Sequence, residues 1–389
     1  MNPTDFSYLD PGAVYLDAAC QSLRPQPVID ALTAYYQIHN SCGERVKYQW
    51  GRITDQKVDT TRAKVLKFLK LKPKDYFASF TLNTTYGINL LLSQLRPGTF
   101  AKVMTSDIEH NSPFLSTMTF ARQHQIKREV IDRAPDGSID LASYDFAQAL
   151  VVVNCVANFD GRELSNLDAL IKKVHAAGGA VIVDAAQAIA HNSSLLHKTA
   201  ADAICFSAHK TYAPSLGVMV VRRDFLKLID TTFIGGGMVD DVTLDHYQLS
   251  ADSTNHIYTK FEPGLQAWGE IIALGAALDW LDQLPKTAHQ TLDGFATELF
   301  DFLSQHPKVH LVNQRPATTI SFYIDGLDSH LVGEALSAAN IMVRTGYFCA
   351  HYYLDHKMHF PPLVRLSLGY HNRPSDIEKT LATLSKILG

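Results

Sequence analysis

Short runs of apolar residues alternate with helix-period segments between residues 76 and 225. In residues 86–95 and 166–179 the apolar positions recur at helical spacing, and the second segment ends in two glycines. Strands buried on both faces that alternate with helices predict a mostly parallel sheet wound with helices. Six runs have the length and β-branched content of strands: 76–82, 102–106, 149–157, 180–187, 202–209 and 217–223.

The pattern changes after about residue 255. A long helical stretch leads into a mixed segment of strands and helices that ends in a closing helix, which predicts a smaller α+β domain. The expected division is 1–255 for the N-terminal segment with the large α/β domain, and 256–389 for the smaller C-terminal domain. The expected elements of the second part are a helix at 266–284, a strand at 319–325, a helix at 330–340 and strands near 341–346 and 364–370.

Composition narrows the class of protein. The 389 residues are 46% hydrophobic and 19% charged, which is typical of a globular chain with two domains. A net charge of −4 without any block of basic residues argues against a general nucleic-acid binder. The N-terminus lacks the order of a signal peptide, and no run of apolar residues is long enough to span a membrane. Five cysteines without a CxxC pair suit neither a disulfide framework nor a zinc site, and they indicate a reducing, cytoplasmic location.

A lysine stands between two apolar runs in "ICFSAHKTYAPSLGVMVVRR". Lys210 is therefore either a surface residue or a functional amine. One helix-and-strand unit earlier, Asp184 ends another apolar run, where a carboxylate needs a cationic or hydrogen-bonding partner. A metal ligand or a helix cap is the alternative for Asp184, but Gln187 is its only polar neighbour in the loop. Ligands of wound sheets bind beyond the carboxyl ends of the strands, so the acid and the amine can face one ligand.

Further polar residues follow other strands. Thr84 and Thr85 begin a helix, where free N–H groups and hydroxyls form a phosphate-binding cup, although an ordinary helix cap is the alternative. His110 follows the strand at 102–106, and a single histidine is more often structural than catalytic. Together with Ser207 and His209, these groups meet the needs of pyridoxal phosphate (PLP): a Schiff-base lysine, a carboxylate for the ring nitrogen, a phosphate cup and a flat stacking group. No GxGxxG motif follows a predicted strand, so a dinucleotide cofactor has no support.

Nine segments, in order along nearly the whole chain, resemble the class V aminotransferase-fold enzymes. Within that group the chain is most similar to the Suf-type cysteine desulfurases and selenocysteine lyases. The resemblance implies the fold type I architecture of PLP-dependent transferases and the conversion of L-cysteine to L-alanine and an enzyme persulfide. The segments are YLDAAC, NTTYGINLLL, SDIEHNS, CVANFDGRE, IVDAAQAIAH, FSAHKTYAPSLGVMVV, GGGM, FEPG and VRTGYFCA.

The resemblance also implies a role for each matching position. Lys210 forms the covalent link to the cofactor and removes the substrate α-proton, Asp184 pairs with the ring nitrogen, and His110 stacks on the ring. Gln187 hydrogen-bonds the ring oxygen. The residues implied to hold the phosphate are Thr84, Thr85, Ser207 and His209. Those implied to bind the substrate are Asn158 and Arg365 at its carboxylate, with Arg344 and Arg45 as further candidates.

Cys349 matches the position of the family's persulfide-forming cysteine. It lies in "RTGYFCAHYY", a segment with a nearby arginine and histidines that can raise thiol reactivity, although its aromatic neighbours could equally bury it. By contrast, Cys155 and Cys205 lie inside apolar runs and are expected to be buried core residues.

The chain departs from its relatives at three places. Tyr347 and Phe348 stand where close relatives often have two histidines, so any proton transfer by those histidines is absent or moved, for example to His351. Leu265 stands where relatives have a threonine that reaches the partner subunit's phosphate. Residues 41–50 match the family's His-Arg loop only loosely, which weakens Arg45. These differences leave the cofactor assignment intact but weaken the assignment of the substrate.

Alternatives to a cysteine desulfurase remain open. One is another class V activity, an aminotransferase or a C–S β-lyase acting on a different amino acid. Others are a non-catalytic PLP-binding scaffold and a helix–sheet protein without a ligand. The family further implies a homodimer with sites built from both subunits, and a protein as the acceptor of sulfur.

Overall fold

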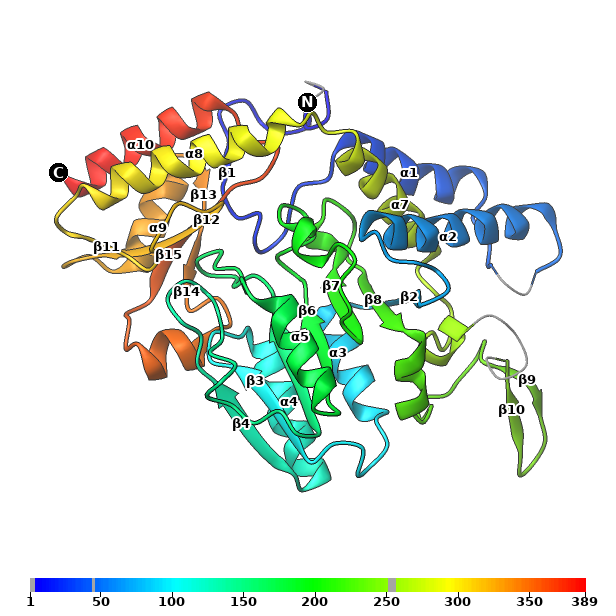
Figure 1. The fold of residues 1–389 in the computed structure, drawn as a ribbon. Helices are drawn as coiled ribbons and strands as arrows, with labels where there is room; N and C mark the ends of the chain where they lie inside the picture. Colours follow the sequence, from blue (N-terminus) through cyan, green and yellow to red (C-terminus); the bar gives the residue numbers. More distant parts are fainter. Residues whose placement is uncertain (1–3, 44–45, 251–256) are drawn as a thin grey trace.

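A seven-stranded sheet forms the centre of the computed structural model, which describes residues 4–43, 46–250 and 257–389 (Figure 1). The strand order is β2-β8-β7-β6-β5-β3-β4, and only β8 runs antiparallel to its neighbours, so the prediction of a mostly parallel wound sheet is confirmed. The strands are β2 (Tyr76–Thr81), β3 (Lys102–Ser106), β4 (Lys127–Ile131), β5 (Ala149–Asn154), β6 (Ala180–Asp184), β7 (Ala203–Ser207) and β8 (Gly217–Arg222).

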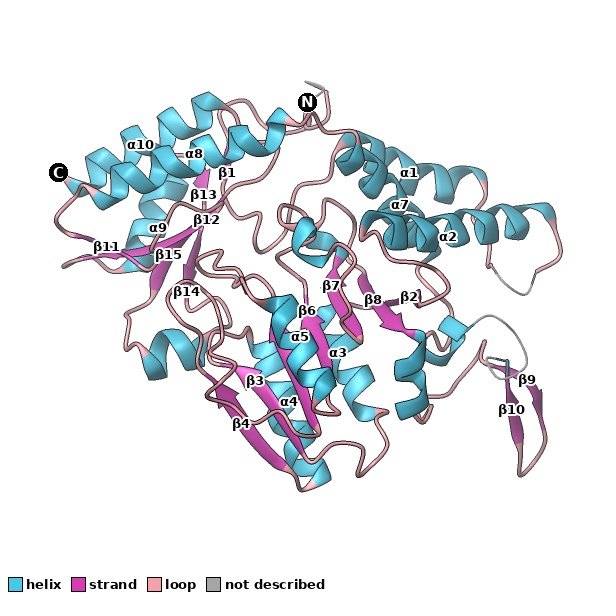
Figure 2. Cartoon of the chain, viewed as in Figure 1, coloured by secondary structure: helices cyan, strands magenta, loops and turns pink. Residues whose placement is uncertain are grey.

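Helices cover both faces of this sheet, which gives three layers (Figure 2). Alternate strand residues face opposite sides: Val151 and Val153 pack in a core with α2, α5 and α7, whereas Leu150 and Val152 pack with α3 and α4. Burial on both faces explains why these strands read as continuous apolar runs. The helices are α1 (Gln26–Ile38), α2 (Gln49–Phe68), α3 (Thr84–Ser93), α4 (Asn111–His124), α5 (Leu167–Ala176) and α7 (Trp268–Asp282).

A second, antiparallel sheet of four strands lies beside the first in the order β11-β12-β15-β14. The N-terminal strand β1 (Val14–Tyr15) pairs in parallel with β13 (Ile341–Met342), so the start of the chain joins the C-terminal region. The elements of this region are β11 (Val309–Leu311), β12 (Thr319–Ile324), β14 (Arg344–Gly346), β15 (Leu363–Ser367), α8 (Thr287–Ser304), α9 (Ser329–Ala338) and α10 (Pro374–Leu388).

The remaining elements are short. A hairpin of β9 (Val239–Val242) and β10 (Tyr247–Leu249) projects from the body of the molecule (Figure 1). Three-residue to six-residue 3₁₀ segments and one π-helical turn occupy the connections: Ser193–Leu196, Ala208–Lys210, Arg223–Leu228, Ile257–Phe261 and Tyr352–Lys357. Among the described helices, none has the length and apolar character needed to cross a membrane.

Packing crosses the expected division at residue 255. Helix α7 follows that position, yet Ile271 and Leu274 are buried in the core of the large sheet. Conversely, Phe6 and Leu16 are buried with the helices of the C-terminal region. The division into residues 1–255 and 256–389 stays a prediction, and the two hydrophobic cores exchange segments across it.

Candidate active site

Residues from the carboxyl ends of β5, β6 and β7 meet at one cavity with a volume of ≈ 270 Å³. The C-terminal region closes the cavity with residues from β14, β15 and the turn after β14. Arg45, a candidate from the sequence, lies outside the described residues. The other candidates from the sequence all line the cavity: Thr84, Thr85, His110, Asn158, Asp184, Gln187, Ser207, His209, Lys210, Arg344, Cys349 and Arg365.

Lys210 ends a short 3₁₀ turn that follows β7. Burial lowers the pKa of its amine, and Asp184 acts in the opposite direction. Within the part of the chain that the structure describes, no hydrogen bond or ion pair engages its Nζ atom. The amine is therefore available to a ligand in the cavity, as a functional lysine requires.

Asp184 is the last residue of β6 and is 4% exposed. Burial raises the pKa of its carboxyl group, while the N–H of Ala186, 2.9 Å from Oδ1, and the charge of Lys210 act against that rise. Across the described ranges no three His, Cys, Asp or Glu side chains gather to hold a metal ion. A buried carboxylate with one backbone partner is a site for a cationic group of a ligand.

The N-terminus of α3 forms the far end of the cavity. Asn83 caps the helix, because its side chain accepts a hydrogen bond from the N–H of Tyr86 at 2.9 Å. Thr84 donates its N–H to Ser207 Oγ at 2.9 Å, and Thr85 Oγ1 lies 2.6 Å from Ser112 Oγ. Hydroxyl groups thus gather at the positive end of a helix dipole, the usual setting for a phosphate.

Gly217 allows β8 to start directly against this helix terminus. A Cβ atom at this position would lie 2.2 Å from Thr81 Oγ1 and 2.5 Å from the backbone nitrogen of Asn83. Both contacts are far inside the van der Waals limit, so any side chain would push the loop before α3 away from β8. The glycine in "APSLGVMVV" therefore fixes where the N-terminus of α3 sits.

His110 precedes α4 and combines a capping role with a position in the cavity. Its Nδ1 accepts a hydrogen bond from the N–H of Ser112 at 3.0 Å, so the neutral ring carries its proton on Nε2. Burial, reinforced by the charges of Lys210 and Arg365, lowers the pKa of His110 to about 3. His110 is therefore a neutral, flat ring fixed by its capping bond, and its stacking on a cofactor stays a prediction.

Arg365 and Asn158 form the polar wall opposite α3. Arg365 Nη2 lies 2.8 Å from Asp17 Oδ1, and its Nη1 donates to the carbonyl oxygen of Asn158 at 3.0 Å. The Asn158 amide donates to the carbonyl oxygen of Phe348 at 2.6 Å. Within the described structure, the buried Nε of Arg365 and Oδ1 of Asn158 have no hydrogen-bond partner. A buried donor and acceptor left open in this way are suited to a polar ligand such as an amino acid.

Cys349 lies in a turn with two successive left-handed residues, Phe348 (φ 48°) and Cys349 (φ 58°). The N–H of Asn111 donates to the carbonyl oxygen of Cys349 at 2.6 Å, and Ala350 closes the turn onto the carbonyl oxygen of Tyr347 at 2.8 Å. These bonds hold a partly buried thiol at the cavity. His351, the expected substitute for the missing histidines, is exposed and is not among the residues that line the cavity.

Two residues were not predicted from the sequence, one in the wall of the cavity and one that contacts a residue of that wall. Cys20 lines the cavity, and Arg344 Nη1 donates to its Sγ at 2.9 Å. Asp17 forms the ion pair with Arg365. The only signal was their place in the "YLDAAC" segment, because their partners lie more than 300 residues away along the chain.

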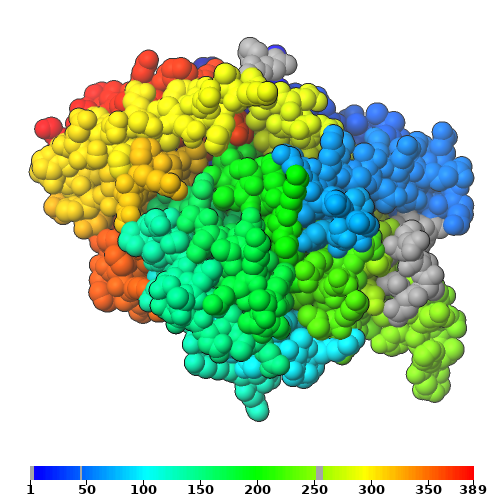
Figure 3. Space-filling view, viewed as in Figure 1, coloured from blue at the N-terminus to red at the C-terminus, as the bar shows by residue number. Residues whose placement is uncertain are grey.

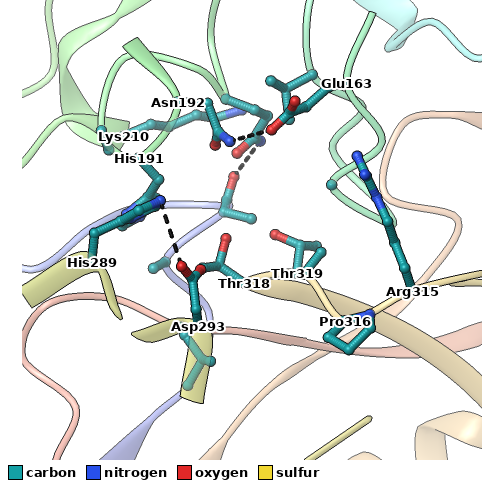
Figure 4. Close-up of a pocket in the computed structure, with 18 residues that line it drawn as sticks. Glu163, His191, Asn192, Lys210, His289, Asp293, Arg315, Pro316, Thr318 and Thr319 are labelled. Carbon is teal, nitrogen blue, oxygen red and sulfur yellow. Dashed lines mark hydrogen bonds and ion pairs between the residues drawn. The ribbon is translucent and has the colours of Figure 1, made fainter. Parts of the chain in front are cut away.

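A second cavity of ≈ 310 Å³ adjoins the first (Figure 4). Gln187 and Ala19, which are joined by a 2.8 Å hydrogen bond, line both cavities and form part of a shared wall. Lys210 also borders both. The polar residues found only in the second cavity are Glu163, His191, Asn192, His289, Asp293, Arg315, Thr318 and Thr319.

Comparison with known proteins identifies the family. The profile of the family "Aminotransferase class-V" matches residues 14–380. A protein of Pasteurella multocida described as a "Probable cysteine desulfurase" is 30% identical, with 98% of this chain and 91% of the relative covered. A cysteine desulfurase of Pectobacterium atrosepticum is 28% identical, with 96% and 92% covered. The apo structure of a cysteine desulfurase from Thermococcus onnurineus NA1 superposes with a TM-score of 0.88 at 27% identity, over 97% of this chain and 94% of that one. The chain belongs to the class V aminotransferase family.

Proposed function

We propose that this protein is a PLP-dependent cysteine desulfurase that converts L-cysteine to L-alanine and leaves the sulfur as a persulfide on Cys349. The observation that supports this most directly is the gathering of a free amine, a buried carboxylate, a helix N-terminus and a thiol around one cavity. The relatives described as cysteine desulfurases over nearly the full chain support the same activity.

The cavity fits PLP in the chemistry of its groups. Lys210 would hold the aldehyde carbon, and Asp184, which has no cationic partner within ion-pair distance among the described residues, would hold the protonated ring nitrogen. His110 would stack on the ring, and Gln187 would contact its oxygen. Thr84, Thr85, Ser207 and His209 would hold the phosphate at the N-terminus of α3. When bound, PLP supplies an electron sink that stabilises negative charge at the substrate α-carbon.

Lys210 is the group that moves the α-proton. Burial lowers the pKa of its amine, so a larger share of the amine is neutral near pH 7 and can accept a proton. Asp184 supports this step, because its negative charge keeps the ring nitrogen of the cofactor protonated.

Arg365 and Asn158 orient the substrate. The open Nε of Arg365 and the wall formed with Asn158 suit the substrate carboxylate, since a guanidinium binds carboxylates with directional hydrogen bonds. Arg344, on the neighbouring strand β14, adds a second positive charge at the cavity. An amino acid held in this way presents its side-chain sulfur to the remaining wall, where Cys349 lies.

Cys349 accepts the sulfur. Its thiolate attacks the substrate sulfur, an S–S bond forms, and the carbon–sulfur bond of the substrate breaks with its electron pair going to carbon. Protonation of that carbon yields alanine. The persulfide then passes to an acceptor, which we propose is a protein thiol.

We further propose a homodimer that works in the reducing environment of the cytoplasm. All five cysteines are free, as a reducing location requires. Four large apolar side chains at the junction of α1 and α2 are exposed, which supports a further protein surface against them: Tyr36, Ile38, Tyr48 and Trp50.

Product analysis tests the function. PLP-loaded protein mixed with L-cysteine and a thiol reductant should release alanine and sulfide in equal amounts. Release of pyruvate and ammonia instead would identify a C–S β-lyase, and release of a keto acid with retained sulfur would identify an aminotransferase. In the matched variant Cys349→Ser, alanine and sulfide release should fall severely, because a serine hydroxyl is a poor nucleophile toward sulfur.

A further inference from the structure

A second thiol, that of Cys20, shares the cavity with Cys349. Cys20 is partly buried, and Arg344 Nη1 donates a hydrogen bond to its Sγ at 2.9 Å. The same cavity holds the buried Arg365, 2% exposed, whose Nε has no hydrogen-bond partner among the described residues. Cys20 therefore faces a polar ligand site and lies beside a guanidinium.

The backbone around Cys20 is held in place from several sides. The N–H of Ala19 donates to Ser367 Oγ at 2.9 Å, and its carbonyl oxygen accepts from Gln187 Nε2 at 2.8 Å. The N–H of Cys20 donates to the carbonyl oxygen of Asp17 at 3.0 Å. These bonds tie the segment to β15 and to the loop after β6, so the thiol has a fixed place at the cavity wall.

Arg365 connects this segment with the turn of Cys349. One end of its guanidinium pairs with Asp17, and the other donates to the carbonyl oxygen of Asn158, whose amide holds the carbonyl oxygen of Phe348. Arg365 thus links the segment that carries Cys20 to the turn that carries Cys349, and all three residues line one cavity. Arg344, which contacts Cys20, lies opposite Arg365 in the register of β14 and β15. Burial lowers the pKa of the Lys210 amine, and Cys20 and Cys349 are both near enough to it to act against that lowering.

We propose that Cys20 is a second sulfur carrier that takes the sulfane sulfur from the persulfide of Cys349. This step rests on the function proposed above. The sulfur of Cys20 attacks the outer sulfur of the persulfide, a new S–S bond forms at Cys20, and the S–S bond at Cys349 breaks. Cys349 leaves as a thiolate and takes up the proton that Cys20 releases. One thiol and one persulfide are present before and after, so no oxidant or reductant is consumed.

Two features favour this exchange. A persulfide carries its outer sulfur about 2 Å beyond Sγ, one S–S bond length, toward the shared cavity. Arg344 donates a charged hydrogen bond to Sγ of Cys20 at 2.9 Å and so holds the attacking sulfur at the cavity wall. The exchange would leave Cys349 free for a second substrate while the first sulfur is still on the enzyme, so one chain could carry two sulfur atoms.

Peptide mass spectrometry tests the proposal. The PLP-loaded enzyme is mixed with an excess of isotopically sulfur-labelled L-cysteine without reductant or oxygen, quenched with an alkylating reagent and digested. We expect an added labelled sulfur on the Cys20 peptide as well as on the Cys349 peptide. Cys42, which is exposed and not among the residues that line the cavity, serves as the internal control for scrambling in solution and should stay unlabelled.

Variants separate the two proposals. In Cys349→Ser the label should disappear from Cys20, because Cys20 receives sulfur only from Cys349. In Cys20→Ser and Cys20→Ala, Cys349 should still be labelled and the bound sulfur should fall from two atoms to one per chain. Label on Cys349 but none on Cys20 in the wild type overturns the relay and leaves the desulfurase intact. Label on Cys20 in Cys349→Ser also overturns the relay. Absence of label from Cys349 in every form overturns the desulfurase itself.

Discussion

At the scale of single residues, the candidate site depends on groups whose environment changes their ordinary charge. Lys210 has a lowered pKa, His110 one of about 3, and Asp184 a raised one, each mainly through burial. A positive ligand group near Asp184 would offset that burial and keep the carboxylate ionised. The bound cofactor is therefore expected to matter for the charge of the site as well as for its chemistry.

The first residue-scale prediction concerns Lys210. Purified protein should be yellow, and borohydride should fix the cofactor to the Lys210 peptide, because the amine there forms a reducible double bond to the aldehyde. Lys210→Ala should lose the covalent link. Mass spectrometry of the reduced digest checks this, and a label on any other lysine would contradict the assignment.

The second concerns Asp184. Asp184→Ala removes the proposed partner of the ring nitrogen, so cofactor affinity and turnover should fall together, turnover by at least about tenfold, or ~1.4 kcal/mol. Titration with PLP followed by absorbance and activity measures both. Asp202, a buried carboxylate paired with Arg222 away from the cavity, offers a control: Asp202→Ala should lower stability without a specific loss of PLP affinity. An Asp184→Ala enzyme with a full rate would show that another group holds the ring nitrogen.

A site residue can be predicted from the sequence when its signal is local, and not when it depends on a contact far away along the chain. Lys210 and Asp184 could be predicted because each directly follows an apolar run, and the ends of parallel strands meet at one edge of a sheet. Cys20 could not, since its neighbour Arg344 is 324 residues away. The same limit applies to edge strand β4, which has the sequence KREVI. Because three of its five residues are charged, the sequence pattern does not predict a strand here, and its pairing with β3 in the structure identifies it.

At the scale of elements, a buried ion pair joins α2 to β2 and to the segment after residue 257. Arg62 Nη1 and Nη2 lie 2.6 and 2.5 Å from the two carboxylate oxygens of Glu262. Glu262 also accepts from the N–H of Phe80 at 2.7 Å and from Ser79 Oγ at 3.0 Å. The glutamate of "FEPG" thus ties its own segment to α2 and to β2, the edge strand of the large sheet.

Removing Glu262 should therefore destabilise the fold. Glu262→Ala leaves a buried guanidinium without its carboxylate, and the free energy of unfolding should fall by about 3–5 kcal/mol. Breaking the exposed pair of Arg96 and Asp230 by Asp230→Ala is the matched control, with an expected loss below about 1 kcal/mol. Urea denaturation compares them, and equal losses would mean that Glu262 has no special structural role.

A buried histidine joins the two ends of the chain. Nε2 of His371 lies 2.8 Å from the carbonyl oxygen of Tyr15, and burial lowers the pKa of His371 to about 4, although that hydrogen bond acts in the opposite direction. Between pH 6.5 and 4, His371 binds a proton in the unfolded chain but not in the folded one. Stability from this group is therefore complete above pH 6.5 and falls with decreasing pH, at up to about 1.4 kcal/mol per unit.

The corresponding experiment compares wild type with His371→Gln. Urea midpoints measured from pH 7.5 to 4 should fall less steeply in the variant, which has no titrating group at this position. The buried Glu109 changes stability with pH in the opposite direction. Its pKa is raised to about 8, so its contribution to stability is lost as pH rises through that value. The comparison within one background removes that effect, and identical slopes would show that His371 is protonated normally in the folded protein.

At the scale of the whole molecule, an exposed apolar surface lies where α1 ends and α2 begins. These helices are the blue part of Figure 3, at one edge of the molecule. We call it the α1–α2 surface; it consists of Tyr36, Ile38, Tyr48 and Trp50. Leu265, just before α7, is 75% exposed. A large apolar side chain at such a position is stabilised when another protein surface covers it.

The last prediction is that the α1–α2 surface lies in a homodimer contact. Ile38→Glu and Trp50→Glu place charges on this surface, and burying them against a second chain would be costly, so both variants should sediment as monomers while the wild type sediments as a dimer. Leu331→Glu on α9, another exposed apolar position, is the matched control and should leave the dimer intact. If the family's two-subunit site applies here, the monomeric variants should also bind PLP less tightly, although none of the substituted residues lines the cavity. A wild-type protein that is a fully active monomer at assay concentration would contradict this arrangement, and the exposed residues would then need another partner.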